Sequence, residues 1–130
     1  MTIRRYIRLV VAVMALTAAA IMLPRIVSSR EDVREVTLVV RNMTYYLDGE
    51  DVPNPALRFT AGERVRVTLR NEDRGMSHDF TIKDWGVATR VLEGKGQDTV
   101  TFRVPSRPAT QPAYTCTPHT AMMSGTILIE

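Results

Sequence analysis

Residues that bind metals through sulfur or imidazole are scarce in this sequence. Its 130 residues include one cysteine, Cys116, and two histidines, His78 and His119. A single cysteine excludes an internal disulfide framework. A free thiol is an oxidation liability in an exported protein, and the N-terminal residues described below indicate export. We therefore interpret Cys116 as a metal-bound thiolate rather than as a structural cysteine.

The chain also lacks an excess of basic charge once the N-terminal stretch is set aside. The formal net charge is +3, but four of the 17 basic residues and none of the 14 acidic residues lie in 1–27. This leaves 13 basic against 14 acidic residues in the rest of the chain. A nucleic-acid-binding domain normally shows a basic face with interleaved aromatic residues. Neither feature is present, and we expect no nucleic-acid partner.

Residues 1–27 have the pattern of a leader. Three arginines precede an uncharged apolar run, Leu9 to Leu23. A basic start followed by an apolar middle is typical of a secretory signal peptide or of an uncleaved signal anchor. We favour a hydrophobic helix retained as an anchor, because Ile21 to Leu23 would make a poor mature start after cleavage at the preceding alanines. The positive-inside tendency then predicts an extracytoplasmic, periplasmic domain, joined by a linker at 28–34.

Residues 35–130 predict an all-β domain. Residues 64–70 alternate, with Val65, Val67 and Leu69 on one face, and residues 99–104 alternate in the same way. The other strand-like segments are 35–41, 57–60, 78–82, 87–92, 114–116 and 126–129. No stretch after Pro24 shows helical periodicity. About seven or eight short strands separated by regular turns indicate a β-sandwich.

The candidate ligands gather near the C-terminal end, where residues 114–130 read YTCTPHTAMMSGTILIE. Cys116, His119 and the pair Met122 and Met123 lie within eight residues. Thiolate and thioether favour Cu(I), and imidazole suits both oxidation states. Two histidines, one cysteine and a distant methionine make a blue-copper site. The second imidazole must come from elsewhere in the chain, and His78 is the only candidate, so we predict one Cu(I)/Cu(II) ion.

Two stretches of the sequence resemble the cupredoxins, the family of plastocyanin, azurin and amicyanin. Cys116-x-x-His119, followed by Met-x-Gly and a final apolar strand, looks like their ligand loop. Residues 67–80, VTLRNEDRGMSHDF, resemble their first-ligand segment, a strand and a polar loop that ends in His78. The resemblance covers residues 36–130. It implies a Greek-key sandwich with a mononuclear type 1 copper site.

Two methionines compete for the axial position that the resemblance implies. Counted from Cys116, Met122 matches the Cys-x-x-His-x-x-Met loop of amicyanin. Counted from His119, Met123 matches the His-x-x-x-Met-x-Gly-Thr of azurin. We favour Met123, because its spacing to Gly125 determines where the side chain points relative to the last strand. Met122 then becomes an apolar surface contact near His119.

The resemblance also assigns roles around the ligands. In cupredoxins the histidine that matches His119 passes electrons, and an apolar patch around it docks the partner. The candidates for that patch in this chain are Pro53, Pro55, Pro118, Ala121 and Met122. The residue after the first histidine is often Asn in the family, whereas here it is Asp79. We expect Asp79 to accept a hydrogen bond from the hydroxyl or the backbone amide of Thr117.

The function implied is electron transfer by a monomer, with a cytochrome or another oxidoreductase as the redox partner. No base, nucleophile or open metal position is visible in the sequence, so we do not expect an enzyme. The alternative is a copper chaperone or storage protein of the cell envelope, although chaperones usually carry more Met and His on flexible segments. A structural sandwich with a vestigial site is a third possibility, and it predicts no copper binding.

Overall fold

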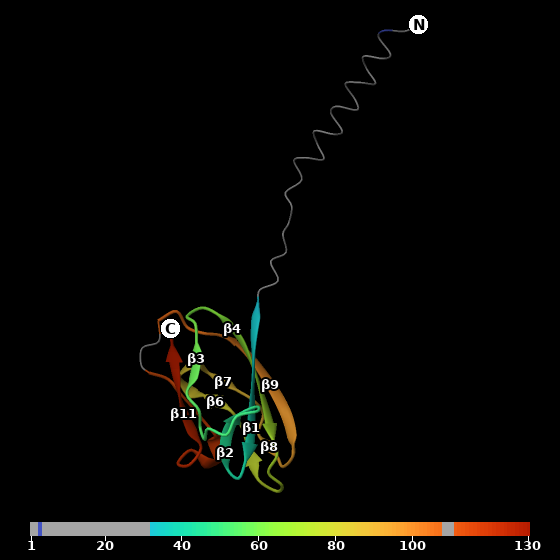
Figure 1. Cartoon of the computed structure of the whole chain (residues 1–130), viewed down its shortest axis with the longest axis vertical. Helices are drawn as coiled ribbons and strands as arrows, with labels where there is room; N and C mark the ends of the chain where they lie inside the picture. Colours follow the sequence, from blue (N-terminus) through green and yellow to red (C-terminus); the bar gives the residue numbers. More distant parts are fainter. Residues whose placement is uncertain (1–2, 4–31, 108–110) are drawn as a thin grey trace. The chain divides into compact units, whose positions relative to one another are not determined.

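The computed structural model describes residues 3, 32–107 and 111–130 (Figure 1). The leader and hydrophobic helix predicted at 1–27 lie outside these residues apart from position 3, as does most of the linker. Within the described part, no helix is long and apolar enough to cross a membrane. The described residues from Asp32 onward belong to one compact unit.

The first sheet contains strands in which buried and exposed residues alternate. Its order is β2 (Thr44–Leu47), β1 (Val33–Arg41), β4 (Arg64–Asn71) and β9 (Gly96–Arg103). β1 is parallel to β4, and the other two pairings are antiparallel. The alternation predicted for 64–70 is confirmed, because Val65, Val67 and Leu69 are fully buried. Residues of β1 pack beside them, so one apolar face of this sheet points into the core.

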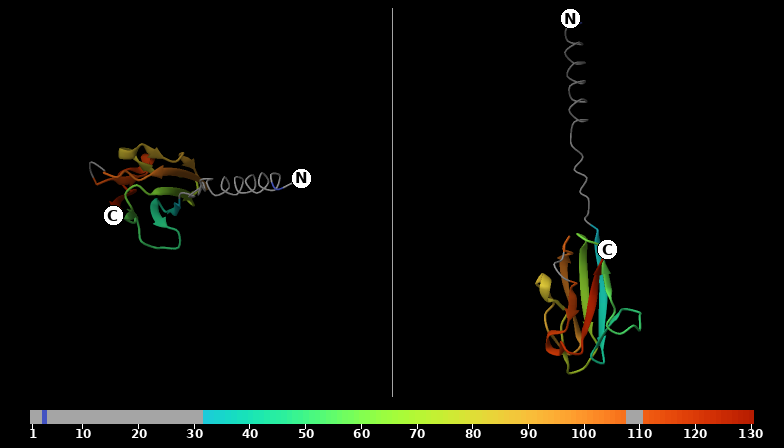
Figure 2. Two further views of the ribbon diagram at one scale, coloured as in Figure 1. Left: turned by 90° about the horizontal axis from the view of Figure 1, so that it is seen from above. Right: turned by 90° about the vertical axis from the view of Figure 1, so that its left-hand side faces the viewer.

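The second sheet carries the C-terminal strands. Its order is β3 (Leu57–Phe59), β11 (Ser124–Ile129), β10 (Ala113–Thr115), β6 (Thr81–Ile82) and β7 (Val87–Ala88). A separate short pair joins β5 (Ser77–His78) to β8 (Leu92–Glu93). The described residues also contain two 3-10 turns, η1 (Lys83–Trp85) and η2 (Thr117–His119). One hydrophobic cluster contains inward residues of both sheets, which makes the unit a β-sandwich (Figure 2).

The described residues contain eleven strands, so the predicted number of seven or eight is too low. The sequence reading missed β2, a strand of four residues that lies between turn signals. The strands predicted at 78–82 and 87–92 each break in two. At the break, the amide of Phe80 donates to the Thr89 hydroxyl, and the amide of Thr89 donates to the Phe80 carbonyl. The chain thereby passes from the short β5–β8 pair into the second sheet.

Aromatic side chains fill the core beneath the C-terminal ligands. Tyr45 from β2 meets Tyr114 from β10 edge-on at 5.2 Å between ring centroids, and Phe80 lies 5.6 Å from Tyr114. All three are fully buried. The Tyr114 hydroxyl donates to the Pro55 carbonyl at 2.6 Å, and the Tyr45 hydroxyl donates to the Asp79 carbonyl. Tyr114 is therefore a core residue.

Candidate metal centre

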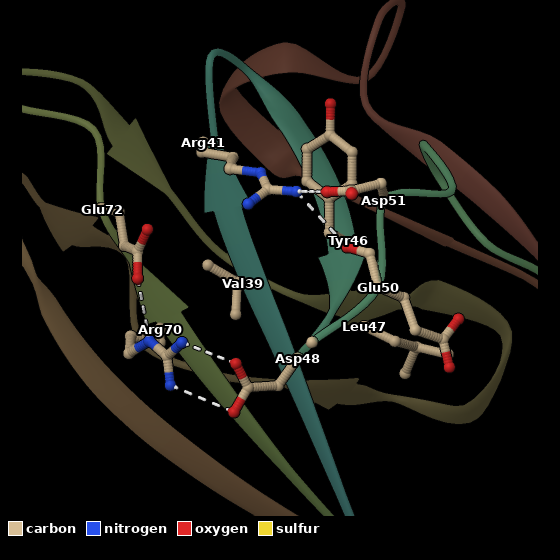
Figure 3. A pocket seen from close by; sticks show the side chains of 10 residues that line it. Val39, Arg41, Tyr46, Leu47, Asp48, Glu50, Asp51, Arg70 and Glu72 are labelled. Carbon is tan, nitrogen blue, oxygen red and sulfur yellow. Dashed lines mark hydrogen bonds and ion pairs between the residues drawn. The ribbon is translucent and has the colours of Figure 1, made fainter.

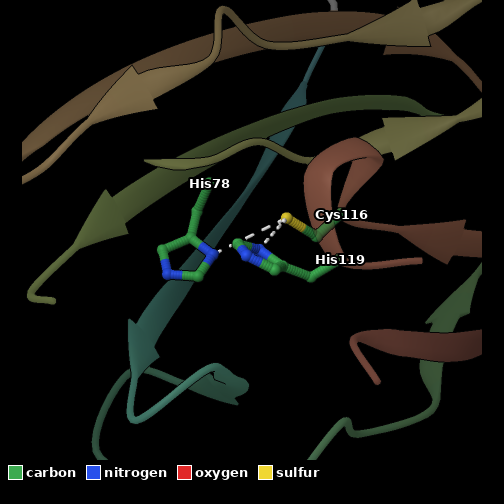
Figure 4. Close-up of side chains that lie close together, drawn as sticks. All are labelled: His78, Cys116 and His119. Atoms are coloured by element: carbon green, nitrogen blue, oxygen red, sulfur yellow. Dashed lines mark hydrogen bonds between the residues drawn. The ribbon is translucent and has the colours of Figure 1, made fainter. Parts of the chain in front are cut away.

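The side chains of His78, Cys116 and His119 converge on one another (Figure 4). The Sγ atom of Cys116 lies 3.6 Å from Nδ1 of His78 and 3.6 Å from Nδ1 of His119. The three candidate ligand atoms all lie within 4.8 Å of one another. No other group of three or more His, Cys, Asp or Glu side chains comes together in this way among the described residues. The structure thus brings together the three ligands that were predicted from residues 78 and 116–119.

Backbone hydrogen bonds shape the loop that holds Cys116 and His119. The amide of Cys116 donates to the carbonyl of Met123, and the amide of Met123 donates to the carbonyl of His119. The amide of His119 donates to the carbonyl of Cys116, which closes the η2 turn. Pro118 lies in the first turn of η2, where a missing backbone N–H is tolerated. The loop therefore holds the side chains of Cys116 and His119 close together.

Burial governs the protonation of Cys116 and of His78. Cys116 and His78 are fully buried, whereas His119 is half-buried. Burial raises the pKa of the Cys116 thiol, although the backbone amides of Asp79 and His119 lower it in part. Burial lowers the pKa of His78 below its usual 6.5, against the raising effect of Asp73. Near pH 7 the His78 ring is thus neutral, as a metal ligand must be, and metal binding has to displace the thiol proton.

Asp79 connects the two ligand-bearing segments. Its Oδ1 accepts a hydrogen bond from the backbone amide of Thr117 at 2.6 Å, so the predicted contact is confirmed for the amide. Its Oδ2 accepts from the Thr81 hydroxyl at 3.3 Å, and the Thr117 hydroxyl pairs with that same hydroxyl. The Asp79 side chain follows His78 directly and bonds beside Cys116, with only 4% of the residue exposed. It therefore fixes one ligand segment against the other.

Exposure separates the two methionines. Met123 is fully buried and belongs to the hydrophobic core cluster. Met122 is 59% exposed. The prediction that Met122 is an apolar surface residue is in line with this exposure.

The apolar patch predicted around His119 needs one correction. Pro55 is buried, because its carbonyl accepts the Tyr114 hydroxyl inside the core. The other four candidates are exposed: Pro53, Pro118, Ala121 and Met122. The Asn54 side chain donates to the Met122 carbonyl at 3.5 Å, which brings the loop that contains Pro53 to the ligand loop.

Asp73 lies in the candidate site, although no sequence pattern predicts it there. Its Oδ2 lies 3.2 Å from Nε2 of His78, the ring nitrogen that points away from Cys116. Burial alone would raise the pKa of Asp73, but the amides of Met43 and Asn42 together with His78 hold it below its usual value. The polar loop before His78 also contains Glu72, and no pattern in it singles out the carboxylate that faces the ring.

A hollow of about 260 Å³ lies on the outer face of the first sheet, and none of its lining residues belongs to the metal centre (Figure 3). Most of its charges are paired within the chain. Arg70 bonds to Asp48 at 2.7 Å and to Glu72 at 3.1 Å. Arg41 bonds to Asp51 and lies 4.2 Å over the Tyr46 ring. These paired charges point to no ligand.

Comparison with known proteins gives matches among solved structures. No protein-family model and no curated protein matches the chain. Auracyanin B is 17% identical with a TM-score of 0.59, over 75% of this chain and 88% of its own. Auracyanin A from Chloroflexus aurantiacus, a "blue" copper protein, is 13% identical with a TM-score of 0.55, over 76% and 100%. Rusticyanin from Thiobacillus ferrooxidans is 20% identical with a TM-score of 0.51, over 75% and 77%. At identities this low, the structural likeness establishes a shared fold and nothing more.

Proposed function

We propose that this chain, which has the cupredoxin fold, is a mononuclear type 1 copper protein that carries single electrons. The observation that carries the proposal is the convergence of Cys116 Sγ with Nδ1 of His78 and of His119. One thiolate and two imidazoles are the equatorial donors of blue-copper sites. The shared fold of auracyanin A, a blue copper protein, supports the proposal.

The donors fit copper and its one-electron chemistry. The bound ion would supply a Cu(I)/Cu(II) couple, which suits the mixed thiolate and imidazole set. The residues around it are held by hydrogen bonds within the chain, through Asp79 on one side and the backbone of the 116–123 loop on the other. A site held in this way needs little reorganisation when the charge changes. Rapid electron exchange requires this property, and catalysis has no part in the proposal.

Met123 is the axial ligand that we propose. It follows His119 in the same loop, its amide donates to the His119 carbonyl, and its side chain is fully buried. A long, weak axial thioether is the usual fourth donor beside His₂Cys. The exposed Met122 suits a surface role instead.

His119 is the proposed point of electron exit. It is half-buried, whereas the other two ligands are fully buried. The exposed residues Pro53, Pro118, Ala121 and Met122 would form an apolar docking surface for a redox protein beside it. We also propose an extracytoplasmic location, supported by the basic and apolar pattern of residues 1–27.

The test is a titration of the full-length chain, purified without metal, with Cu(II) while visible absorption and electron paramagnetic resonance are recorded. One equivalent should give an intense charge-transfer band and a narrow copper hyperfine splitting. Cys116→Ser and His78→Ala should abolish both signals. Ser106→Ala, an exposed position outside the metal centre, serves as the control and should leave them unchanged.

Colourless or multi-site copper binding would contradict the proposal and favour a chaperone or storage protein. A complete lack of binding would favour a structural sandwich. An unaltered spectrum in His78→Ala would remove that residue from the ligand set.

A further inference from the structure

Asp73 touches the metal centre from the side opposite Cys116. The His78 ring lies between them, with Nδ1 3.6 Å from Cys116 Sγ and Nε2 3.2 Å from Asp73 Oδ2. His78 is fully buried, and the Asp73 side chain is only 14% exposed. The carboxylate is thus well placed to act on the ring nitrogen that does not face the other ligands.

The Asp73 carboxylate is held from several directions. Its Oδ1 accepts the backbone amide of Asn42 at 2.6 Å, and its Oδ2 accepts the amide of Met43 at 2.9 Å. Its own amide donates to the Asn71 side chain at 3.0 Å. Asn71 is buried, and its side-chain nitrogen donates to three backbone carbonyls, those of Met76, Leu92 and Gly94. The carboxylate therefore has little freedom to turn away from His78.

The two amide donors come from an unusual turn. Asn42 and Met43 connect β1 to β2 as a two-residue hairpin loop, with φ angles of 50° and 55°. Hairpins with positive φ at both central residues normally use Asn-Gly or Asp-Gly, since a residue with a side chain is disfavoured there. Hydrogen bonds from both amides to Asp73 offset this cost. In Figure 1 this turn and the loop before β11 lie at the same end of the sandwich.

The chemistry of a carboxylate against an imidazole leaves one arrangement of the proton. An ionised carboxylate only accepts hydrogen bonds, so the Nε2 of His78 must donate. A neutral imidazole that carries its proton on Nε2 has a free lone pair on Nδ1. That lone pair faces Cys116 and His119, where a metal would bind.

We propose that Asp73 is the positioning residue for His78: it fixes the ring with Nδ1 free, and its negative charge stabilises Cu(II) relative to Cu(I). The copper part of this inference rests on the proposed function. The tautomer part does not, because it concerns the metal-free protein. Carboxylate partners of this kind orient metal-bound histidines and raise their basicity.

The first test needs no metal and no substitution. Nitrogen-15 magnetic resonance of the full-length, metal-free chain reports which ring nitrogen of His78 carries the proton. The expected result is a proton on Nε2, with Nδ1 unprotonated. A His78 ring protonated on Nδ1 would overturn the inference, whether or not the protein binds copper.

The second test compares Asp73→Asn with the unaltered full-length chain. An Asn side chain has one oxygen and one N–H₂ group, so the N–H₂ must face either a backbone amide donor or the His78 ring. With the negative charge also removed, His78 should lose its strong preference for the Nε2 proton. We expect Cu(II) affinity to fall by about ten- to a hundredfold and Cu(I) affinity to fall less. Each tenfold fall in the ratio of Cu(II) affinity to Cu(I) affinity raises the reduction potential by about 59 mV.

Asp98→Asn is the matched control. Asp98 also accepts a backbone amide, that of Arg90 at 2.7 Å, and also has a lowered pKa caused first by that hydrogen bond. It does not belong to the metal cluster. If Asp73→Asn lowers stability but leaves the His78 tautomer and the ratio of affinities unchanged, as Asp98→Asn should, Asp73 is structural only. If the unaltered chain binds no copper, the proposed function fails, and the tautomer measurement still decides the role of Asp73.

Discussion

At the scale of single residues, the candidate ligands differ in how far each is removed from solvent. Cys116 and His78 are fully buried, and His119 is half-buried. Deep burial of the thiol and one imidazole would keep water from competing for a bound metal, while the half-buried imidazole would leave a short route to the surface. The two methionines also differ in exposure, because Met123 is buried and Met122 is exposed. Substitution of each can therefore tell their roles apart.

Replacing each methionine with leucine separates the axial ligand from a surface contact. Met-to-Leu changes conserve volume and usually cost less than about 1.5 kcal/mol, so both variants should fold. Met123→Leu should alter the copper absorption and electron paramagnetic resonance spectra, because it removes a buried thioether. Met122→Leu, at a position that is 59% exposed, should leave both spectra unchanged. The reverse pattern would assign the axial role to Met122.

Asp79 carries a negative charge next to both ligand segments. In Asp79→Asn the side-chain oxygen can still accept the Thr117 amide, and the new N–H₂ can donate to the Thr81 hydroxyl. The substitution therefore removes charge with little change of shape. Because a nearby negative charge favours Cu(II), the reduction potential should rise, on the order of tens of millivolts.

Voltammetry of the copper-loaded protein measures this shift. Asp51→Asn is the control, since that carboxylate pairs with Arg41 and its side chain is 97% exposed. Equal potentials in Asp79→Asn and the unaltered protein would show that the charge of Asp79 is screened from the metal.

Most of the candidate site could be predicted from the sequence, because chemistry restricts its residue types. With one cysteine and two histidines in the chain, a thiolate–imidazole site has few alternatives. Asp73 could not be predicted in this way. Its role depends on amides that lie 31 and 30 residues earlier, which only the β1–β2 turn brings to it. Pro55 shows the opposite error: apolar character suggested an exposed patch, but the Tyr114 hydrogen bond holds it inside.

At the scale of elements, the pairing of β10 with β11 determines the geometry of the ligand loop. Tyr114 pairs with Gly125 across this ladder. Tyr114 lies two residues before Cys116, and Gly125 lies two residues after Met123. A Cβ atom on Gly125 would lie 2.3 to 2.4 Å from two ring carbons and the hydroxyl oxygen of Tyr114. The ring cannot easily move away, since it is buried and its hydroxyl bonds to Pro55. Gly125 is therefore required for close packing at the base of the loop.

Gly125→Ala should destabilise the protein by about 1–3 kcal/mol, the usual cost of overpacking a core. Gly96→Ala is the control, because Gly96 also lies in a strand and the nearest atom to its new Cβ would be 3.9 Å away. Chemical unfolding of both variants measures the difference. Equal free energies of unfolding would show that the β10–β11 ladder relaxes around the methyl group at little cost.

Strands with one buried face were the easiest elements to predict. In β4 every second residue enters the core, so its sequence alternates over the whole strand. The break between β5 and β6 leaves no such trace, because it depends on the reciprocal bonds between Phe80 and Thr89. β2 has four residues, too few for a clear period, and it was missed even though it supplies the buried Tyr45.

At the scale of the whole molecule, the candidate metal centre joins segments that are far apart in the sequence. Asp73 and the β1–β2 turn support His78 from the end of the first sheet, and the 116–123 loop belongs to the second sheet. In the unfolded chain, Cys116 and His78 are 38 residues apart and form no site. Metal binding should therefore be coupled to folding of the entire sandwich.

Copper should raise the thermal stability of the full-length protein by an amount that depends on free copper concentration. A ligand that binds only the folded state at a hundredfold excess over its Kd contributes about 2.7 kcal/mol. For a domain of this size each kcal/mol corresponds to about 4–8 °C, so Tm should rise by roughly 10–20 °C. Anaerobic melts in buffered Cu(I) measure the shift, because oxidation of the thiol is then avoided. Cys116→Ser should remove most of it, whereas Met122→Leu should keep it in full. A shift that survives in Cys116→Ser would mean that copper stabilises the fold from somewhere other than the buried thiolate.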